Sequence, residues 1–207
     1  MDTHRPRLVL ASASPARQRT LAAAGLTAEV VPSGVDESSV DAATPRDLCQ
    51  ELARRKAEAV AERIRADGPD GEVLVLGCDS VLELDGEALG KPPDPAAAVQ
   101  RWRRLRGRAG VLHTGHALVA CAAGRVIEEV GSTVVHFADV SDAEIDAYVA
   151  TGEPLEVAGG FTIDGRGGVF VERIEGDPGT VIGLSLPVLR RLLARLGTPV
   201  TTLWRRG

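Results

Sequence analysis

The residue best suited to chemistry is Asp79, which interrupts the apolar run VLVLGCDSVLEL over residues 73–84. An unpaired carboxylate inside a buried strand costs free energy, so this side chain needs either a partner or a task. It either binds a metal ion or accepts a proton, or it is satisfied by backbone N–H groups near the strand end. We favour a functional role, because active sites of α/β proteins gather at the ends of strands.

A second set of candidates lies where a short apolar run, residues 8–11, passes through Ser12 and Ser14 into a helical pattern. Serine followed by proline is typical of a helix N-terminus. Free N–H groups and the helix dipole at such a turn attract an anion, and Arg17 and Arg19 add positive charge. The stretch therefore predicts a phosphate-binding turn. The alternative is a capped helix with two surface arginines.

Three more charged residues are weak candidates when each is taken alone. Glu37 lies in an acidic loop, Lys56 lies in a long helical pattern, and Lys91 follows a glycine near a tight turn. Each is also typical of a solvated surface. Together with Asp79 and the serine turn, they suit a triphosphate with a divalent cation. Carboxylate oxygens bind Mg²⁺, while hydroxyl groups and cations neutralise phosphates.

Composition and absent motifs exclude several other functions. The 207-residue chain has a net charge of −5 at pH 7, which argues against a protein that binds duplexes without sequence preference. Aromatic residues make up 3%, which leaves few rings for stacking single-stranded bases, so we expect no nucleic-acid partner. The sequence contains no GxSxG, no Walker loop, no dinucleotide GxGxxG and no zinc-ligand spacing.

The cysteines and the apolar runs bear on the compartment. Cys49, Cys78 and Cys121 are scattered and odd in number, which favours a reducing cytoplasm over a disulfide framework. The apolar part of the N-terminus is too short for a signal peptide, and no run approaches the length of a membrane span. We therefore expect a cytoplasmic protein with no membrane partner.

The elements that must position these residues alternate in type, which predicts an α/β fold in one domain over residues 1–207. Strands are predicted over residues 8–11, 28–31, 73–84, 111–121 and 126–137, the last two as an antiparallel hairpin. Helices are predicted from 16 to about 25, and over 45–66, 95–106, 142–152 and 186–196. A further β turn at 164–168 is predicted between the runs 159–163 and 169–174, followed by a loop at 176–179.

Ordered blocks over nearly the whole chain, roughly residues 8 to 196, resemble the Maf family of nucleoside-triphosphate pyrophosphatases. Several blocks in the right order are more specific than any single motif. The blocks are LASASPARQRTL, VDE at 35–37, LARRKAEAVA, GCDSVLELDGEALGKP, LRGRAGVLHTGHAL and YVATGEPLEVAGGFTIDGRGGVFVERIEGDPGTVIGLSL.

The resemblance implies hydrolysis of a nucleoside triphosphate between the α and β phosphates, with a divalent metal, Mg²⁺ or Mn²⁺, as cofactor. It implies a twisted mixed β-sheet flanked by helices, with two lobes around a cleft, as in inosine-triphosphate pyrophosphatases. Members of the family are often homodimers and are linked to the arrest of septum formation. The competing hypothesis is a nucleotide-binding regulator of cell division that acts through a partner without turnover.

By position, the resemblance assigns roles to individual residues. Phosphate binding is implied for Ser12, Ser14, Arg17, Lys56 and Lys91. Metal binding is implied for Glu37 and Asp79, and Asp79 is also the favoured proton acceptor, while Ser80 and Asp164 lie on the base or metal side. Ala16, Ser80, Val157 and Asp164 depart from the pattern of one large branch, so the preferred nucleobase stays open.

Overall fold

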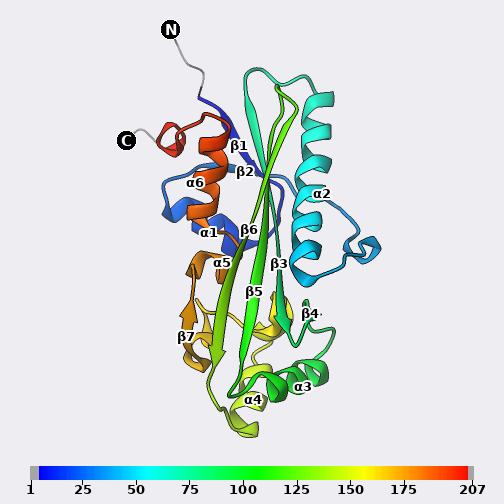
Figure 1. Cartoon of the computed structure of the whole chain (residues 1–207), viewed down its shortest axis with the longest axis vertical. Helices are drawn as coiled ribbons and strands as arrows, with labels where there is room; N and C mark the ends of the chain where they lie inside the picture. The colour runs from blue at the N-terminus through cyan, green and yellow to red at the C-terminus, as the bar shows by residue number, and fades with distance from the viewer. Residues whose placement is uncertain (1–4, 205–207) are drawn as a thin grey trace.

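A mixed sheet of seven strands forms the centre of the protein in the computed structural model, which describes residues 5–204 (Figure 1). The strand order is β2-β1-β3-β5-β6-β7, with β4 paired to β3; β1 runs parallel to β2 and β3, and the other pairs are antiparallel. The strands are β1 Arg7–Leu10, β2 Ala28–Val30, β3 Val73–Leu84, β4 Glu87–Leu89, β5 Ala109–Ala120, β6 Arg125–Phe137 and β7 Val171–Glu175. The predicted mixed α/β sheet is confirmed, as is the antiparallel hairpin of β5 and β6.

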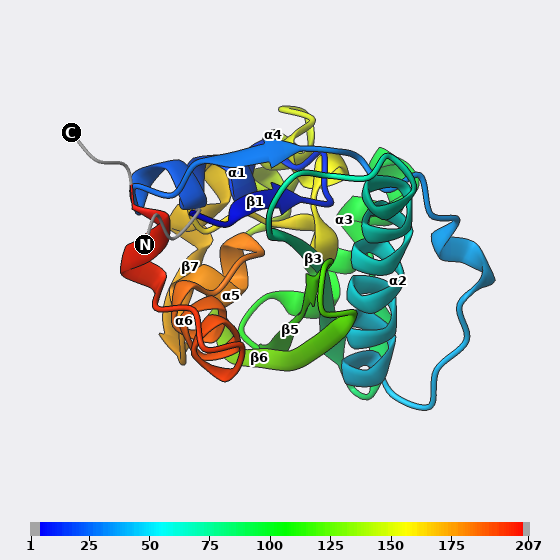
Figure 2. The same cartoon turned by 90° about the horizontal axis from the view of Figure 1, so that it is seen from above.

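Helices cover both faces of the sheet. Seen from above, α2 lies on one side and α5 and α6 lie on the other (Figure 2). The helices within residues 5–204 are α1 Pro15–Ala23, α2 Pro45–Ala66, α3 Pro95–Leu105, α4 Asp142–Val149, α5 Pro178–Ile182 and α6 Leu186–Arg195. Each begins with proline in its first turn or with a serine capping box, and all of them except α5 were predicted from the sequence.

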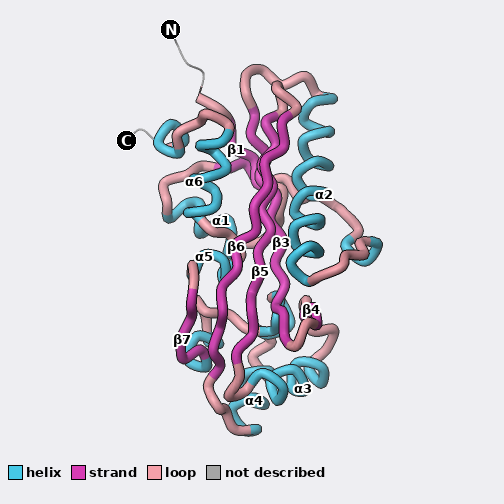
Figure 3. The backbone as a smooth tube through the Cα atoms, viewed as in Figure 1, coloured by secondary structure: helices cyan, strands magenta, loops and turns pink. Residues whose placement is uncertain are grey.

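Alternation along the strands divides the core between the two faces. In β3, Val73 and Val75 pack with the small residues of α2, while Leu74 and Leu76 pack with the leucines of α6. A strand that is buried on both faces reads as a continuous apolar run, which is why this segment was recognisable from the sequence. Three of the strands, β3, β5 and β6, run along most of the length of the molecule (Figure 3).

Helix α2 lies unusually close to the sheet, because glycine replaces a side chain at two positions beneath it. A Cβ atom at Gly77 would lie 2.2 Å from the carbonyl oxygen of Ala53, and one at Gly115 would lie 2.3 Å from that of Cys49. Only glycine permits such an approach of one backbone to another. The close packing brings the middle of α2 against the middle of β3, where the strongest candidate residues lie.

Aromatic side chains form a separate core at the end of the molecule where α3 and α4 meet. Trp102 contacts Phe137, Tyr148 and Phe170 edge-on, with ring centroids 5.3–5.7 Å apart. Its indole N–H donates to the carbonyl oxygen of Gly160 at 2.9 Å. Most of the few aromatic side chains of the protein thus have a structural role in this core.

The predicted β turn at 164–168, between the runs 159–163 and 169–174, is only partly correct. Residues Ala158–Gly160 and Arg166–Phe170 form 3₁₀ turns, and only residues 171–174 of the region enter the sheet, as part of β7, which pairs with β6. Left-handed φ angles of +77° at Gly159 and Gly160 break any strand there. The predicted loop at 176–179 is also only partly correct, because α5 begins within it and is capped by Asp177.

None of the helices within residues 5–204 is long and apolar enough to cross a membrane. The prediction about a signal peptide depends partly on residues 1–4, which lie outside the described residues.

Candidate active site

The turn between β1 and α1 uses both of its serines to shape the backbone. Ser12 is almost fully buried, and its Oγ accepts a hydrogen bond from the N–H of Ser14 at 3.2 Å. Ser14 is the N-cap of α1 and accepts from the N–H of Arg17 at 3.5 Å. The N-terminus of α1 is therefore capped, as in the alternative of a capped helix that the sequence left open. The cap itself fixes where the remaining N–H groups of the first turn point.

The guanidinium of Arg17 is held between three elements. Its Nε donates to the carbonyl oxygen of Gly183 at 2.8 Å, at the end of α5. Its Nη1 donates to Ser12 Oγ at 3.0 Å, and its Nη2 donates to Ser80 Oγ in β3 at 3.3 Å. All three acceptors are neutral, so a fixed, unneutralised positive charge lies beside the serine turn. An anion oxygen makes a stronger hydrogen bond to such a group than a hydroxyl does.

Behind Ser80, a chain of hydroxyl groups leads into the core. Thr114 donates to the carbonyl oxygen of Thr180 at 2.7 Å, so its Oγ1 accepts the proton of Ser80 at 2.8 Å. That direction leaves the lone pairs of Ser80 Oγ for Arg17. Neither Thr114 nor Thr180 was among the predicted site residues. The only signal at Thr114 is a hydroxyl beside a glycine in the apolar strand β5, and Thr180 takes part through its backbone carbonyl oxygen, which no sequence pattern marks.

On the opposite face of β3, Asp79 and Glu37 converge on one ammonium group. Lys56 Nζ lies 2.6 Å from Asp79 Oδ1 and 2.6 Å from Glu37 Oε1. The side chains of Lys56 and Asp79 are 9% and 12% exposed, whereas that of Glu37 is 57% exposed. Burial raises the pKa of Asp79, while the charges of Lys56 and Arg17 act in the other direction. The site thus holds a desolvated carboxylate beside a buried cation.

This arrangement has the donor chemistry that a hard divalent cation requires. Two carboxylates already point at a single positive group, and Mg²⁺ is commonly bound by one or two carboxylates together with substrate phosphates and water. Within residues 5–204, no group of three or more His, Cys, Asp or Glu side chains could hold a metal ion. A metal held by Glu37 and Asp79 would therefore need further oxygens from the substrate.

Lys91 is the one phosphate-binding candidate that the structure does not bring to the others. It is exposed and makes no hydrogen bond or ion pair with any other residue of the described chain, 5–204. Its neighbour Gly90 is fixed, because its carbonyl oxygen accepts from the N–H of Gly159 at 3.0 Å and from Arg101. The backbone that carries Lys91 is thus anchored while its side chain is available.

Asp164 reaches the site from a different direction. It is exposed, and its Oδ2 lies 3.5 Å from Nη2 of Arg19, one helical turn into α1. It does not contact Asp79, Lys56 or Glu37. The structure therefore groups Asp164 with the helix of the serine turn.

A buried histidine lies beneath the same region. His116 is fully buried in β5, and its Nε2 accepts from the N–H of Ser185 at 2.9 Å. Burial, together with the charge of Arg17, lowers the pKa of His116 to about 4. The ring is neutral near pH 7 and caps the start of α6, so we assign it a structural role.

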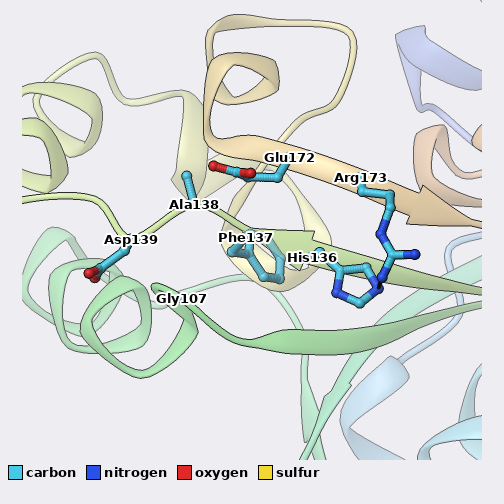
Figure 4. A pocket seen from close by; sticks show the side chains of 7 residues that line it. All are labelled: Gly107, His136, Phe137, Ala138, Asp139, Glu172 and Arg173. Atoms are coloured by element: carbon cyan, nitrogen blue, oxygen red, sulfur yellow. Dashed lines mark hydrogen bonds between the residues drawn. The ribbon is translucent and has the colours of Figure 1, made fainter.

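A cavity of about 470 Å³ lies outside this site and contains none of the candidate residues (Figure 4). It is lined by Gly107, His136, Phe137, Ala138, Asp139, Glu172 and Arg173. Glu175 binds the side chains of both His136 and Arg173 at 2.9 Å, so the positive charge of Arg173 in this lining is already paired.

The sequence profile of the family described as Maf-like protein matches residues 7–196. The chain belongs to the Maf family. It is 66% identical to the nucleoside triphosphate pyrophosphatase of Salinispora tropica, over 97% of this chain and 88% of that protein. The protein of the same name from Streptomyces coelicolor is 57% identical over 97% of this chain and 95% of its own length. The one from Synechococcus elongatus is 54% identical over 97% and 98%.

The Maf blocks recognised in the sequence supply most of the clustered residues. The first block forms the serine turn, the lysine block forms the middle of α2, and the GCDS block forms the centre of β3. Blocks that are far apart in the chain thus meet on the two faces of a single strand.

Proposed function

We propose that this Maf protein hydrolyses nucleoside triphosphates between the α and β phosphates, releasing a nucleoside monophosphate and pyrophosphate. The names of the relatives support the reaction. The single observation that carries it is the convergence of Asp79 and Glu37 on Lys56, across β3 from the fixed guanidinium of Arg17. Simple nucleotide binding has no use for a buried carboxylate that is able to accept a proton.

The phosphates are bound by the serine turn, Arg17, Lys56 and Lys91. Arg17 needs no reorganisation to do this, because its side chain is already held by Ser12, Ser80 and Gly183. Negative charge builds on the leaving pyrophosphate, and preorganised cations stabilise that charge most effectively. Lys91 adds an available ammonium from the loop after β4.

Asp79 accepts the proton of the attacking water. The water oxygen forms a bond to the α phosphorus, the bond from that phosphorus to the bridging oxygen breaks, and pyrophosphate leaves with the electron pair. Burial raises the pKa of Asp79 and makes it a better base, while Lys56 keeps it ionised.

Glu37 and Asp79 hold the divalent metal, Mg²⁺ or Mn²⁺. When bound, the metal supplies neutralisation of phosphate charge and a more acidic water. Glu37 is exposed in a polar segment, so it can follow a substrate that enters, whereas Asp79 is fixed in the sheet. Lys56 contacts both carboxylates and keeps them close to each other before a metal arrives.

The competing function, a regulator without turnover, is not favoured by the relatives, which are named as enzymes. A link to septum formation stays a prediction that rests on the family resemblance alone.

We also propose that the protein works in the cytoplasm, where its three buried free cysteines stay reduced, and that it binds no nucleic acid. The absence of a nucleic-acid partner is supported by the arginines of α3 and the turn after it, four of which form ion pairs with Asp85, Glu87 or Asp142.

The test of the function is direct. Purified protein is incubated with a panel of ribo- and deoxyribonucleoside triphosphates and with Mg²⁺ or Mn²⁺, and both products are measured. We expect equimolar monophosphate and pyrophosphate from at least one triphosphate, and none after chelation. Failure to release pyrophosphate from any member of the panel would contradict the proposal. We also propose that the protein is a homodimer, as the family resemblance implies, and light scattering of the same sample tests this.

A further inference from the structure

A glycine-rich loop, residues 162–167, is wrapped around the carboxylate of Glu153. We call it the Glu153 loop. Glu153 itself lies in the 3₁₀ turn Glu153–Glu156 that follows α4. Four donors reach its two oxygens: Tyr148 Oη at 2.8 Å, Thr162 Oγ1 at 2.5 Å and the N–H of Gly167 at 3.0 Å on Oε1, and the N–H of Arg166 at 3.1 Å on Oε2.

The glycines of the loop are required by this close wrapping. A Cβ atom at Gly165 would lie 2.9 Å from Glu153 Oε2, and one at Gly167 would lie 2.4 Å from the hydroxyl oxygen of Tyr148. The loop therefore resembles an anion-binding loop that is filled by a carboxylate of the same chain. The carboxylate, rather than a ladder of strand hydrogen bonds, holds this segment in place.

The contacts require an ionised Glu153. Partial burial by itself raises the pKa of the carboxyl, but the hydrogen bonds from Thr162, Gly167, Tyr148 and Arg166 outweigh it and lower the pKa to about 2. An ionised carboxylate accepts at every lone pair and never donates, which matches a shell made entirely of donors.

The Glu153 loop also carries Asp164, the residue that reaches toward the serine turn. Asp164 Oδ2 lies 3.5 Å from Arg19 Nη2 in α1, the helix that begins at the phosphate-binding turn. Both side chains are exposed, so this contact is too weak to fix the loop. The position of Asp164 against α1 therefore depends on how firmly Glu153 holds the backbone on either side of it.

We propose that Glu153 is a positioning residue for nucleotide recognition: it touches no substrate, but it fixes the loop that presents Asp164 beside α1, and so sets the affinity for the nucleotide and the preference among bases. The inference rests on the proposed function. It concerns KM and base preference, and leaves the proton transfer at Asp79 unaffected, because Asp79 lies on β3 away from this loop.

The first test compares Glu153→Gln with the matched control Glu156→Gln in the same turn. Glu156 is exposed and makes no hydrogen bond or ion pair within residues 5–204. In Glu153→Gln, the amide nitrogen cannot accept, so at least one loop donor loses its partner. We expect KM to rise about tenfold and base preference to flatten, with kcat changed by less than about threefold. The control should behave like the wild type.

A milder variant guards against misfolding. Thr162→Val removes one donor to Glu153 and keeps the shape of the side chain. It should raise KM in the same direction by about twofold to fivefold.

Limited trypsin digestion measures how firmly the loop is held, and it does not depend on enzymatic turnover. It is applicable because Arg166, a trypsin site, is exposed within the loop. Cleavage after Arg166, identified by fragment mass, should be several-fold faster in Glu153→Gln than in wild type or control. Unchanged KM and base preference in a folded Glu153→Gln variant would overturn the inference, whatever the cleavage rate. If the wild type and the control release no pyrophosphate, the proposed function is refuted instead. In that case, cleavage after Arg166 that is no faster in Glu153→Gln than in the wild type would refute the positioning of the loop by Glu153.

Discussion

Asp79 and Ser80 are neighbours in β3 and serve opposite faces of the sheet. Asp79 points toward α2 and meets Lys56, while Ser80 points toward α1 and meets Arg17. Asp79 was predictable because a carboxylate in a buried strand stands out from its surroundings. The role of Ser80 was harder to predict, because hydroxyl side chains are common in strands and only the structure shows that this one contacts Arg17.

Replacing Arg17 should be far more harmful than replacing Arg19. Arg17→Ala removes a fixed charge that three acceptors hold, and we expect kcat/KM to fall by about a hundredfold. Arg19→Ala, on the exposed face of the same helix, should cost less than about tenfold. Steady-state kinetics on both variants checks this. A silent Arg17→Ala beside a crippled Arg19→Ala would reverse the assignment of the two arginines.

Asp164 should influence which base is preferred. An ionised carboxylate only accepts hydrogen bonds, so it favours base edges rich in N–H, such as those of cytosine and guanine. Asp164→Gln should shift the specificity constants toward UTP and dTTP by about tenfold relative to CTP and GTP. If all of these substrates, together with 7-methyl-GTP, change by one common factor, Asp164 serves the metal or the chemistry rather than the base.

At the scale of elements, the site depends on how closely α2 packs on the sheet. Gly77 and Gly115 let the backbone of the helix rest on β3 and β5, which places Lys56 over Asp79. The caps, prolines and apolar stripes made the helices predictable. The region 159–174 was only partly predictable. Its glycines were interpreted as a β turn between two β-type runs, whereas residues 162–167 are held by Glu153, which lies outside the region.

Gly77→Ala tests this packing. The new Cβ would lie 2.2 Å from the carbonyl oxygen of Ala53, so α2 must shift. We expect a loss of about 1–3 kcal/mol in the free energy of unfolding and a marked fall in turnover, as Lys56 leaves Asp79. Chemical denaturation measures the first and pyrophosphate release the second. Gly90→Ala, where a Cβ meets nothing within 4 Å, is the control for stability. Equal stability of the two variants would contradict the close-packing argument.

The Glu153 loop should make stability depend on pH in the acid range. The pKa of Glu153 is lowered from 4.5 to about 2, so its contribution is complete above about pH 5 and is lost as the pH falls from about 4.5 toward 2. Discounted for partial exposure, we expect about 1–2 kcal/mol. Denaturation of wild type and Glu153→Gln between pH 3 and 7 checks the sign. The difference in the free energy of unfolding between the two proteins should shrink at low pH. A difference that does not change with pH would contradict an ionised Glu153 that holds the loop.

At the scale of the whole molecule, distant parts of the chain meet at one strand. Arg17 binds the carbonyl oxygen of Gly183, and Lys56 binds Asp79 from a separate helix. Pattern predicted the α/β class and most of the candidate residues, and the ordered family blocks assigned their roles and added Ser80 and Asp164. Neither could give these contacts, because they depend on the strand order and on the close approach of α2. Lys91 illustrates the remaining gap, since its block was recognised although its side chain contacts none of the other candidates.

If Asp79 is the proton acceptor of a pyrophosphatase, Asp79→Asn should abolish most of the turnover. The amide keeps the size of the side chain but loses its charge and its basicity. The measurement is the rate of pyrophosphate release from the best substrate at saturating Mg²⁺ or Mn²⁺, with thermal unfolding to show that the variant is folded. We expect a rate at least about a hundredfold below wild type in a folded protein. A folded Asp79→Asn protein that releases pyrophosphate at nearly the wild-type rate would contradict this role of Asp79.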